Sequence, residues 1–131
     1  ELTHAMQLLY LPHIMQPTRK GKHKDGASTL SKILNELTQL RNSKKNIADQ
    51  ALDHICTLRR NANYPSNKYP AEIHAELIAI EVNNHKLFTL LCKMCPHTKA
   101  WYKKLNEIAY KRAYARVCTT KRKAWPKPSS V

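Results

Sequence analysis

Glycine is almost missing from this chain, and its scarcity constrains the fold more than any other feature does. Among 131 residues there are only two glycines, Gly21 and Gly26, and they lie close together. Strand-rich folds need turn residues, glycine above all, at short intervals along the chain. Two glycines in one short segment cannot supply those turns. The sequence therefore predicts an all-α domain.

Apolar residues recur at helical spacing through most of the chain. The clearest stripe follows the i, i+3, i+4, i+7 rule and consists of Leu30, Ile33, Leu34, Leu37 and Leu40. Weaker stripes lie within residues 2–11, 47–58, 70–82, 87–94 and 98–117. We expect five to six helices, packed as a compact bundle or as a repeat-like array, with a basic C-terminal helix and tail.

Composition changes along the chain suggest its organisation. We expect an N-terminal helical segment at 1–15, a basic flexible linker at 16–28, a helical core domain at 29–118 and a basic flexible tail at 119–131. Ser28 or Thr29 is the expected N-cap of the first core helix. Because the chain starts at Glu1 rather than at Met, we expect it to be a fragment of a larger protein.

Neither a secretory signal nor a membrane span is evident in the sequence. The four cysteines are few enough to be read as reduced thiols, because disulfide scaffolds are cysteine-dense. We therefore expect an intracellular protein of the nucleus or cytosol that has no membrane partner.

Net charge points most directly to function. The chain has 23 Lys and Arg residues against 9 Asp and Glu residues, which gives +14 at pH 7. The final segment, 96–131, holds ten basic residues and a single acidic one, Glu107. Such an excess of one sign repels itself, and it is typical of a domain whose partner is a polyanion.

Basic residues of the last predicted helix are the expected phosphate ligands, together with those of the tail and the linker. They are Lys99, Lys103, Lys104, Lys111, Arg112, Arg116, Lys121, Arg122, Lys123, Arg19 and Lys20. Three tyrosines are interleaved with them: Tyr102, Tyr110 and Tyr114. Their rings are equally suited to stacking on unpaired bases and to packing in the core, so both interpretations stay open.

Two short clusters raise the question of zinc. One is His54-x-Cys56 and the other is Cys92-x-x-Cys95-x-His97. Zinc binds four nitrogen or sulfur ligands, and Cys-x-x-Cys is a frequent spacing for them. However, a second Cys-x-x-Cys is missing, and cysteines beside Leu91 or Ile55 are typical of core thiols. The sequence favours core thiols, and we expect no metal and no cofactor.

Catalysis is not expected either. The chain has no glycine-rich phosphate loop and no serine in a nucleophile-elbow context. The leading hypothesis is a nucleic-acid-binding domain, RNA favoured over DNA, that contacts mainly the backbone. The alternative is a helical protein–protein interaction module, which would bind an acidic protein partner or a second copy of itself as a homodimer.

Overall fold

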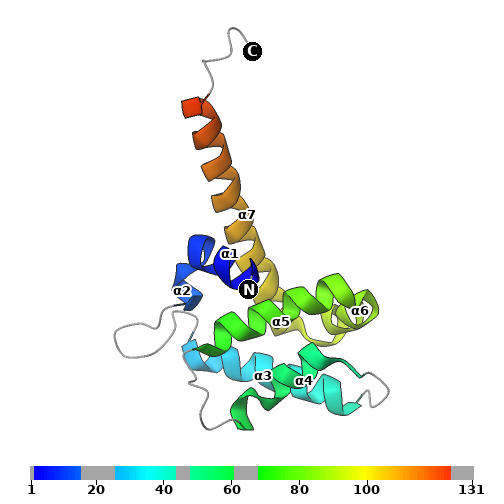
Figure 1. Cartoon of the computed structure of the whole chain (residues 1–131). Coiled ribbons are helices and arrows are strands. Elements are labelled where there is room, and N and C mark those ends of the chain that lie inside the picture. The colour runs from blue at the N-terminus through cyan, green and yellow to red at the C-terminus, as the bar shows by residue number, and fades with distance from the viewer. Residues whose placement is uncertain (1, 16–25, 44–47, 61–67, 125–131) are drawn as a thin grey trace.

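Prolines and side-chain caps mark where the helices of this chain begin. The structure is a computed structural model that describes residues 2–15, 26–43, 48–60 and 68–124 (Figure 1). Within these ranges the elements are α1 (Leu2–Tyr10), α2 (Pro12–Met15), α3 (Gly26–Ser43), α4 (Gln50–Thr57), the 3-10 turn η1 (Leu58–Arg60), α5 (Tyr69–Asn83), α6 (His85–Met94) and α7 (Pro96–Ala124). The described residues contain no strand, so the predicted all-α class is confirmed.

Proline lies in the first turn of α2, α5 and α7, where its missing N–H costs no helical hydrogen bond. Asp49 caps α4 by accepting from the N–H of Leu52 at 3.0 Å. Asn84 caps α6 by accepting from the N–H of Leu87 at 3.2 Å. The two caps are also bonded to each other, because the Asn84 amide donates to Asp49 Oδ2 at 3.0 Å. The starts of α4 and α6 are thereby held side by side.

Two boundaries differ from those expected. Helix α3 begins at Gly26, ahead of the expected cap at Ser28 or Thr29. Helix α7 continues to Ala124, so it includes the first residues of the segment expected to be a flexible tail. The apolar stripe of this helix ends near Val117, but alanine, lysine and arginine favour helix without any apolar contact. Residues 125–131 lie outside the described part.

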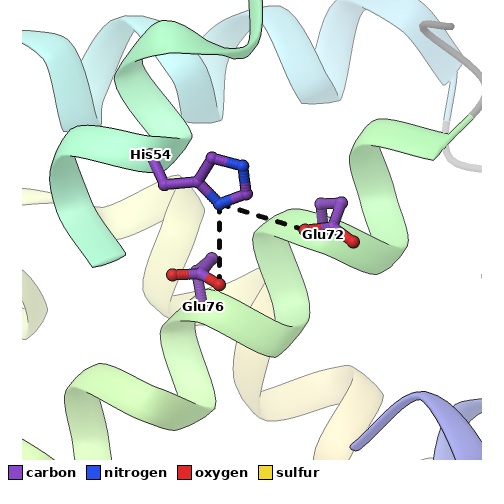
Figure 2. A group of neighbouring side chains, drawn as sticks. All are labelled: His54, Glu72 and Glu76. Carbon is purple, nitrogen blue, oxygen red and sulfur yellow. Dashed lines mark ion pairs between the residues drawn. The ribbon is translucent and has the colours of Figure 1, made fainter. Parts of the chain in front are cut away.

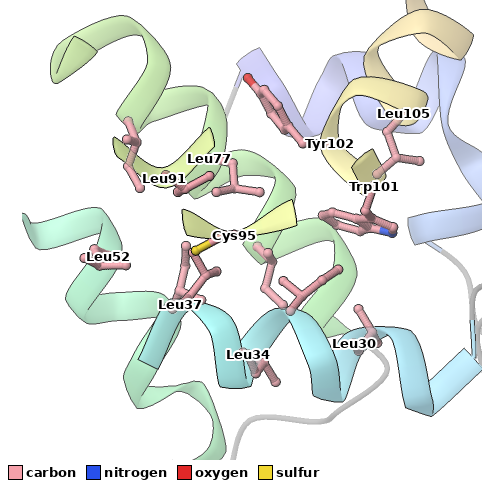
Figure 3. Close-up of a cluster of buried hydrophobic side chains, with 14 of the residues drawn as sticks. Leu30, Leu34, Leu37, Leu52, Leu77, Leu91, Cys95, Trp101, Tyr102 and Leu105 are labelled. Carbon is pink, nitrogen blue, oxygen red and sulfur yellow. The ribbon is translucent and has the colours of Figure 1, made fainter. Parts of the chain in front are cut away.

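One hydrophobic core joins all the helices (Figure 3). The predicted stripe of α3 forms one wall, with Ile33 and Leu37 fully buried. Leu77 of α5 and Leu91 of α6 face it, and the base of α7 adds further apolar side chains. Leu11 and Ile14, from the expected N-terminal segment, are fully buried in the same core. The segment 2–15 therefore packs as part of this domain.

The buried face of helix α1 is not the face that carries its leucines. Its leucines Leu2, Leu8 and Leu9 are exposed, whereas Gln7 is fully buried. The Gln7 amide donates to the carbonyl of Ala71 at 3.0 Å and to His74 Nδ1 at 2.8 Å. Burial of polar groups requires such hydrogen bonds. A buried polar network on α5 therefore decides which face of α1 turns inward.

Helix α5 lies at the centre of the domain and packs against α1, α2, α4 and α6. Helix α7 packs against α1, α3 and α6 near its start and then projects away from the body (Figure 1). No helix in the described ranges has both the length and the apolar character that crossing a bilayer requires.

Candidate nucleic-acid interface

A groove of about 360 Å³ lies where the first half of α7 meets α5 and α6. Aromatic rings and lysines alternate around it. Its lining consists of Glu81, Phe88, Cys92, Lys99, Tyr102, Lys103, Asn106, Glu107, Tyr110 and Lys111. The α7 members recur at spacings of three and four residues, so they share one face of that helix. We name this feature the α7 groove.

Tyr102 forms the floor of the α7 groove and belongs to the core. Its side chain is only 3% exposed, and its hydroxyl donates to Glu81 Oε1 at 2.7 Å. Phe88 meets the ring edge-on at a centroid distance of 5.6 Å. Burial raises the pKa of Tyr102, and the hydrogen bond to Glu81 raises it further. Of the two roles open to the tyrosines, Tyr102 therefore takes the core one.

The lysines at the rim are exposed. Lys99, Lys103, Lys104 and Lys111 all lie on the solvent side of α7. None of the ion pairs that the described residues form involves any of these four lysines. Their ammonium groups are thus available to an external anion.

The acidic side chains do not neutralise the lysines because most of them are used inside the fold. Among the described acidic residues, only Asp53 pairs with a cationic Lys or Arg, at 2.8 Å from Arg41. Five others bond tyrosine, histidine, asparagine or backbone groups: Glu81, Glu72, Glu76, Asp49 and Glu36. The charge excess of the chain consequently appears as positive surface.

The second half of α7 presents two tyrosines to solvent. Tyr110 is 71% exposed and Tyr114 is 63% exposed. Their rings stack on each other at a centroid distance of 6.4 Å and an angle of 19°. Exposed planar rings next to Lys111 and Arg116 are typical of single-strand binding surfaces. For these two tyrosines the structure is compatible with the stacking role, since neither is in the core.

Arg112 has a partner in another helix of the fold. Its guanidinium donates to the carbonyl of Tyr10 at 2.7 Å, which ties α7 to the end of α1. Helix α7 carries Lys121, Arg122 and Lys123 as well, although their side chains lie outside the described part. Arg19 and Lys20 also lie outside it. The described interface therefore consists of the α7 groove and the exposed tyrosine pair.

The zinc candidates of the sequence are not brought together. Among the described residues, the only group of three or more close metal-ligating side chains is His54, Glu72 and Glu76, and it contains no cysteine. Cys92 lines the α7 groove, while Cys56 is half-buried in α4, where burial raises its pKa. Burial likewise raises the pKa of Cys95 to about 12.

His97 and Cys95 have a structural partner in Glu36 of α3. The carboxylate of Glu36 accepts from the N–H of Thr98 at 2.8 Å and from the N–H of His97 at 3.2 Å. The Thr98 hydroxyl and the His97 ring donate to it as well, and the Cys95 thiol contacts the Glu36 carbonyl at 3.7 Å. Burial alone would raise the pKa of Glu36, but these hydrogen bonds outweigh burial and lower it. Glu36 thus caps α7 from another helix.

Five groove residues were not predicted from the sequence as parts of the nucleic-acid interface: Glu81, Phe88, Cys92, Asn106 and Glu107. Phe88 belonged to an apolar stripe and was indistinguishable from core. Asn106 accepts a hydrogen bond from buried His74 at 2.8 Å, a contact made across 32 positions of the sequence. Such contacts depend on helix packing, and the local pattern gives no signal of them.

Comparison with known proteins gives no relative from which to infer a function. No protein-family model, no curated protein and no solved structure matches this chain.

Proposed function

We propose that this protein binds single-stranded nucleic acid, RNA in preference to DNA, along the exposed side of α7. The observation that carries the proposal is the combination of exposed aromatic rings with lysines that have no internal partner. Tyr110 and Tyr114 offer π-faces to unpaired bases, and Lys99, Lys103 and Lys111 lie beside the α7 groove, where they can hold phosphates.

The preference for a single strand follows from the chemistry of the surface. Bases in a duplex are already stacked, so exposed tyrosines gain little there. Proteins that recognise RNA mostly contact unpaired loops and ends, where bases stack on aromatic side chains. Direct reading of a duplex by a helix-turn-helix or a basic zipper is not expected, because the sequence has neither pattern.

The test is a charge reversal of Lys99, Lys103, Lys104 and Lys111 to Glu. These four are exposed and without an internal partner, so the fold should be retained. A matched control reverses the exposed lysines Lys32, Lys68, Lys86 and Lys93, none of which lines the α7 groove. Both variants change the net charge equally and differ only in where the change lies.

We expect the α7 reversal to weaken binding of single-stranded RNA by more than about 100-fold, measured by fluorescence anisotropy at low salt. The control should lose much less. Each single Lys→Ala change at the rim should flatten the dependence of log affinity on log salt by about 0.7. Equal losses in the two reversals would show that the binding is non-specific attraction. Undetectable binding of wild-type protein to RNA and DNA at low salt would refute the proposal.

A protein-interaction role is the second candidate, and the exposed leucines of α1 favour it. Leu2, Leu8 and Leu9 form an apolar surface that no described segment covers, and such surfaces often mark protein contacts. Sedimentation analysis of wild type and of Leu8→Lys/Leu9→Lys separates the two functions. A dimer that the double variant dissociates, in protein that binds no RNA, would establish this second role.

A further inference from the structure

Three metal-ligating side chains, none of which lines the α7 groove, converge between α4 and α5 (Figure 2). His54 reaches over from α4, while Glu72 and Glu76 stand four residues apart on one side of α5. His54 Nδ1 lies 3.6 Å from Glu76 Oε1 and 3.9 Å from Glu72 Oε2. One ligand atom from each residue lies within 4.8 Å of the others.

The two separations from His54 are longer than hydrogen bonds. Ligands bound to tetrahedral zinc at about 2.0–2.2 Å are about 3.4 Å apart, slightly closer than these atoms are. A small inward shift of the side chains would therefore let the histidine and the two carboxylates bind one small cation. In contrast, the surface pair His97–Glu36 is closed directly at 2.9 Å and leaves no position for an ion between its members.

The negative charge of the two glutamates also favours the binding of a cation. Two carboxylates lie on the same helix face, and within the described residues their ion pairs are to histidines alone. Burial raises the pKa of Glu76, while His54 lowers it and the charges of Glu72 and Asp49 raise it again. In a chain of +14, this is a place where negative charge accumulates. A divalent cation would remove the repulsion between the two carboxylates.

One of the ligands is further oriented by a third helix. His4 Nε2 of α1 lies 3.1 Å from Glu72 Oε1, the oxygen that does not face His54. His4 Nδ1 is in turn bonded to Gln7 Oε1 at 2.8 Å, and Gln7 is buried. Partners of this kind fix the orientation of metal-binding carboxylates. Glu72 is thus held with one oxygen facing the site and one facing its support.

We propose that His54, Glu72 and Glu76 bind a divalent transition-metal ion of the zinc type, with Glu72 oriented by His4. Imidazole nitrogen favours such ions over magnesium and calcium, which take oxygen ligands. His54 is 45% exposed at its side chain, so solvent reaches the site and can occupy the remaining coordination positions. The site contains no residue of the proposed nucleic-acid interface, and its failure would leave that proposal intact.

The test is zinc titration of the full chain after chelator treatment, by isothermal calorimetry. We expect one ion per chain, and a melting temperature that rises with zinc because the ion binds the folded state. His54→Ala and Glu76→Gln should each weaken zinc binding by at least about 10-fold. The matched control is His97→Ala, which removes an exposed histidine that pairs with a single carboxylate, and it should bind zinc like wild type.

X-ray absorption of the zinc-loaded protein distinguishes this site from the cysteines. We expect nitrogen and oxygen neighbours only, whereas a sulfur neighbour at about 2.3 Å would mean that thiolates bind the ion. That result would overturn the proposal, and so would an absence of saturable binding in wild type. Unchanged affinity in Glu76→Gln, which preserves the shape of the side chain, would overturn it even if His54→Ala failed to fold.

Discussion

The first half of α7, up to Ala109, and its second half, from Tyr110 onward, differ both in charge and in surroundings. The first half contains three lysines and one glutamate, whereas the second half contains six lysines and arginines and no acidic residue. In the first half Trp101, Tyr102 and Leu105 are buried against the body of the domain. In the second half Tyr110, Tyr114 and Val117 are exposed along a helix that leaves the body (Figure 1). One continuous helix thus changes from a packed element to a projecting arm.

In terms of the proposed function, this difference separates the residues that stabilise the fold from those that would contact a ligand. Buried side chains of the first half contribute hydrophobic stabilisation to the fold. The projecting half contributes little of this kind, so its residues can be chosen for contact with a ligand. Stability should therefore depend on the first half and nucleic-acid affinity on the exposed positions.

The largest expected effect is on the free energy of unfolding. It should appear when truncation of a buried leucine in the first half is compared with truncation of an exposed valine in the second half. Leu105→Ala removes a side chain that is 2% exposed and should lower the free energy of unfolding by about 2–5 kcal/mol. Val117→Ala truncates a side chain that is 51% exposed and should change it by less than about 0.5 kcal/mol. Urea unfolding followed by circular dichroism measures both. Similar losses at the two positions would mean that the projecting half also packs in solution.

Affinity for nucleic acid should depend on the exposed tyrosines of the second half and not on the buried tyrosine of the first half. Tyr110→Leu and Tyr114→Leu should each cost about 1–3 kcal/mol of affinity for single-stranded RNA and leave the melting temperature unchanged. Tyr102→Phe deletes the hydroxyl that donates to Glu81 and should cost about 1–3 kcal/mol of stability with affinity retained. A loss of stability in the first pair, without a loss of affinity, would contradict the division.

A smaller effect should come from Glu36, which caps the packed end of α7. Glu36→Gln keeps the shape but removes the charge, and should cost about 0.5–2 kcal/mol at pH 7. Because folding lowers the pKa of Glu36, its contribution is complete above the ordinary value of 4.5 and is lost as the pH falls through the folded-state pKa.

Urea unfolding of wild type and Glu36→Gln at several pH values tests this sign. The two proteins should converge in stability as the solution is acidified below pH 4.5. Exposed Glu107→Gln is the control and should differ little from wild type at any pH. A gap between wild type and Glu36→Gln that stays constant down to acid pH would show that the carboxylate charge does not act as a cap.

The sequence predicts the helical class and the core of α3 well, because both depend on local regularities. Scarce glycine and the spacing from Leu30 to Leu40 need no tertiary information. For α1 the spacing predicts the helix itself, but it does not predict that the leucines are exposed and that Gln7 is buried. Gln7 turns inward to bond His74, a partner far along the chain, and hydropathy alone gives no signal of that bond.

The candidate site could be predicted only in part, because some of its residues come from different helices. The exposed lysines and the tyrosine pair follow from spacing on a single helix. The floor of the α7 groove requires residues of α5 and α6, and the His54–Glu72–Glu76 cluster requires α4 to lie against α5. In the sequence, His54 stood near Cys56, a pair that raised the question of zinc but was interpreted as part of the core. The actual neighbours of His54 come from another helix.

The hydrogen bond from Arg112 to the carbonyl of Tyr10 attaches α7 to α1 at a point well beyond the start of the helix. Glu36 caps the N-terminus of α7, and Arg112 holds the helix against α1 just beyond its packed half. From Tyr110 to Ala124 the arm extends about 22 Å at 1.5 Å per residue, so a tilt of about 10° moves its tip by about 4 Å. Because Arg112 ties this arm to α1, a shift of α1 would be passed on to the tip of the arm.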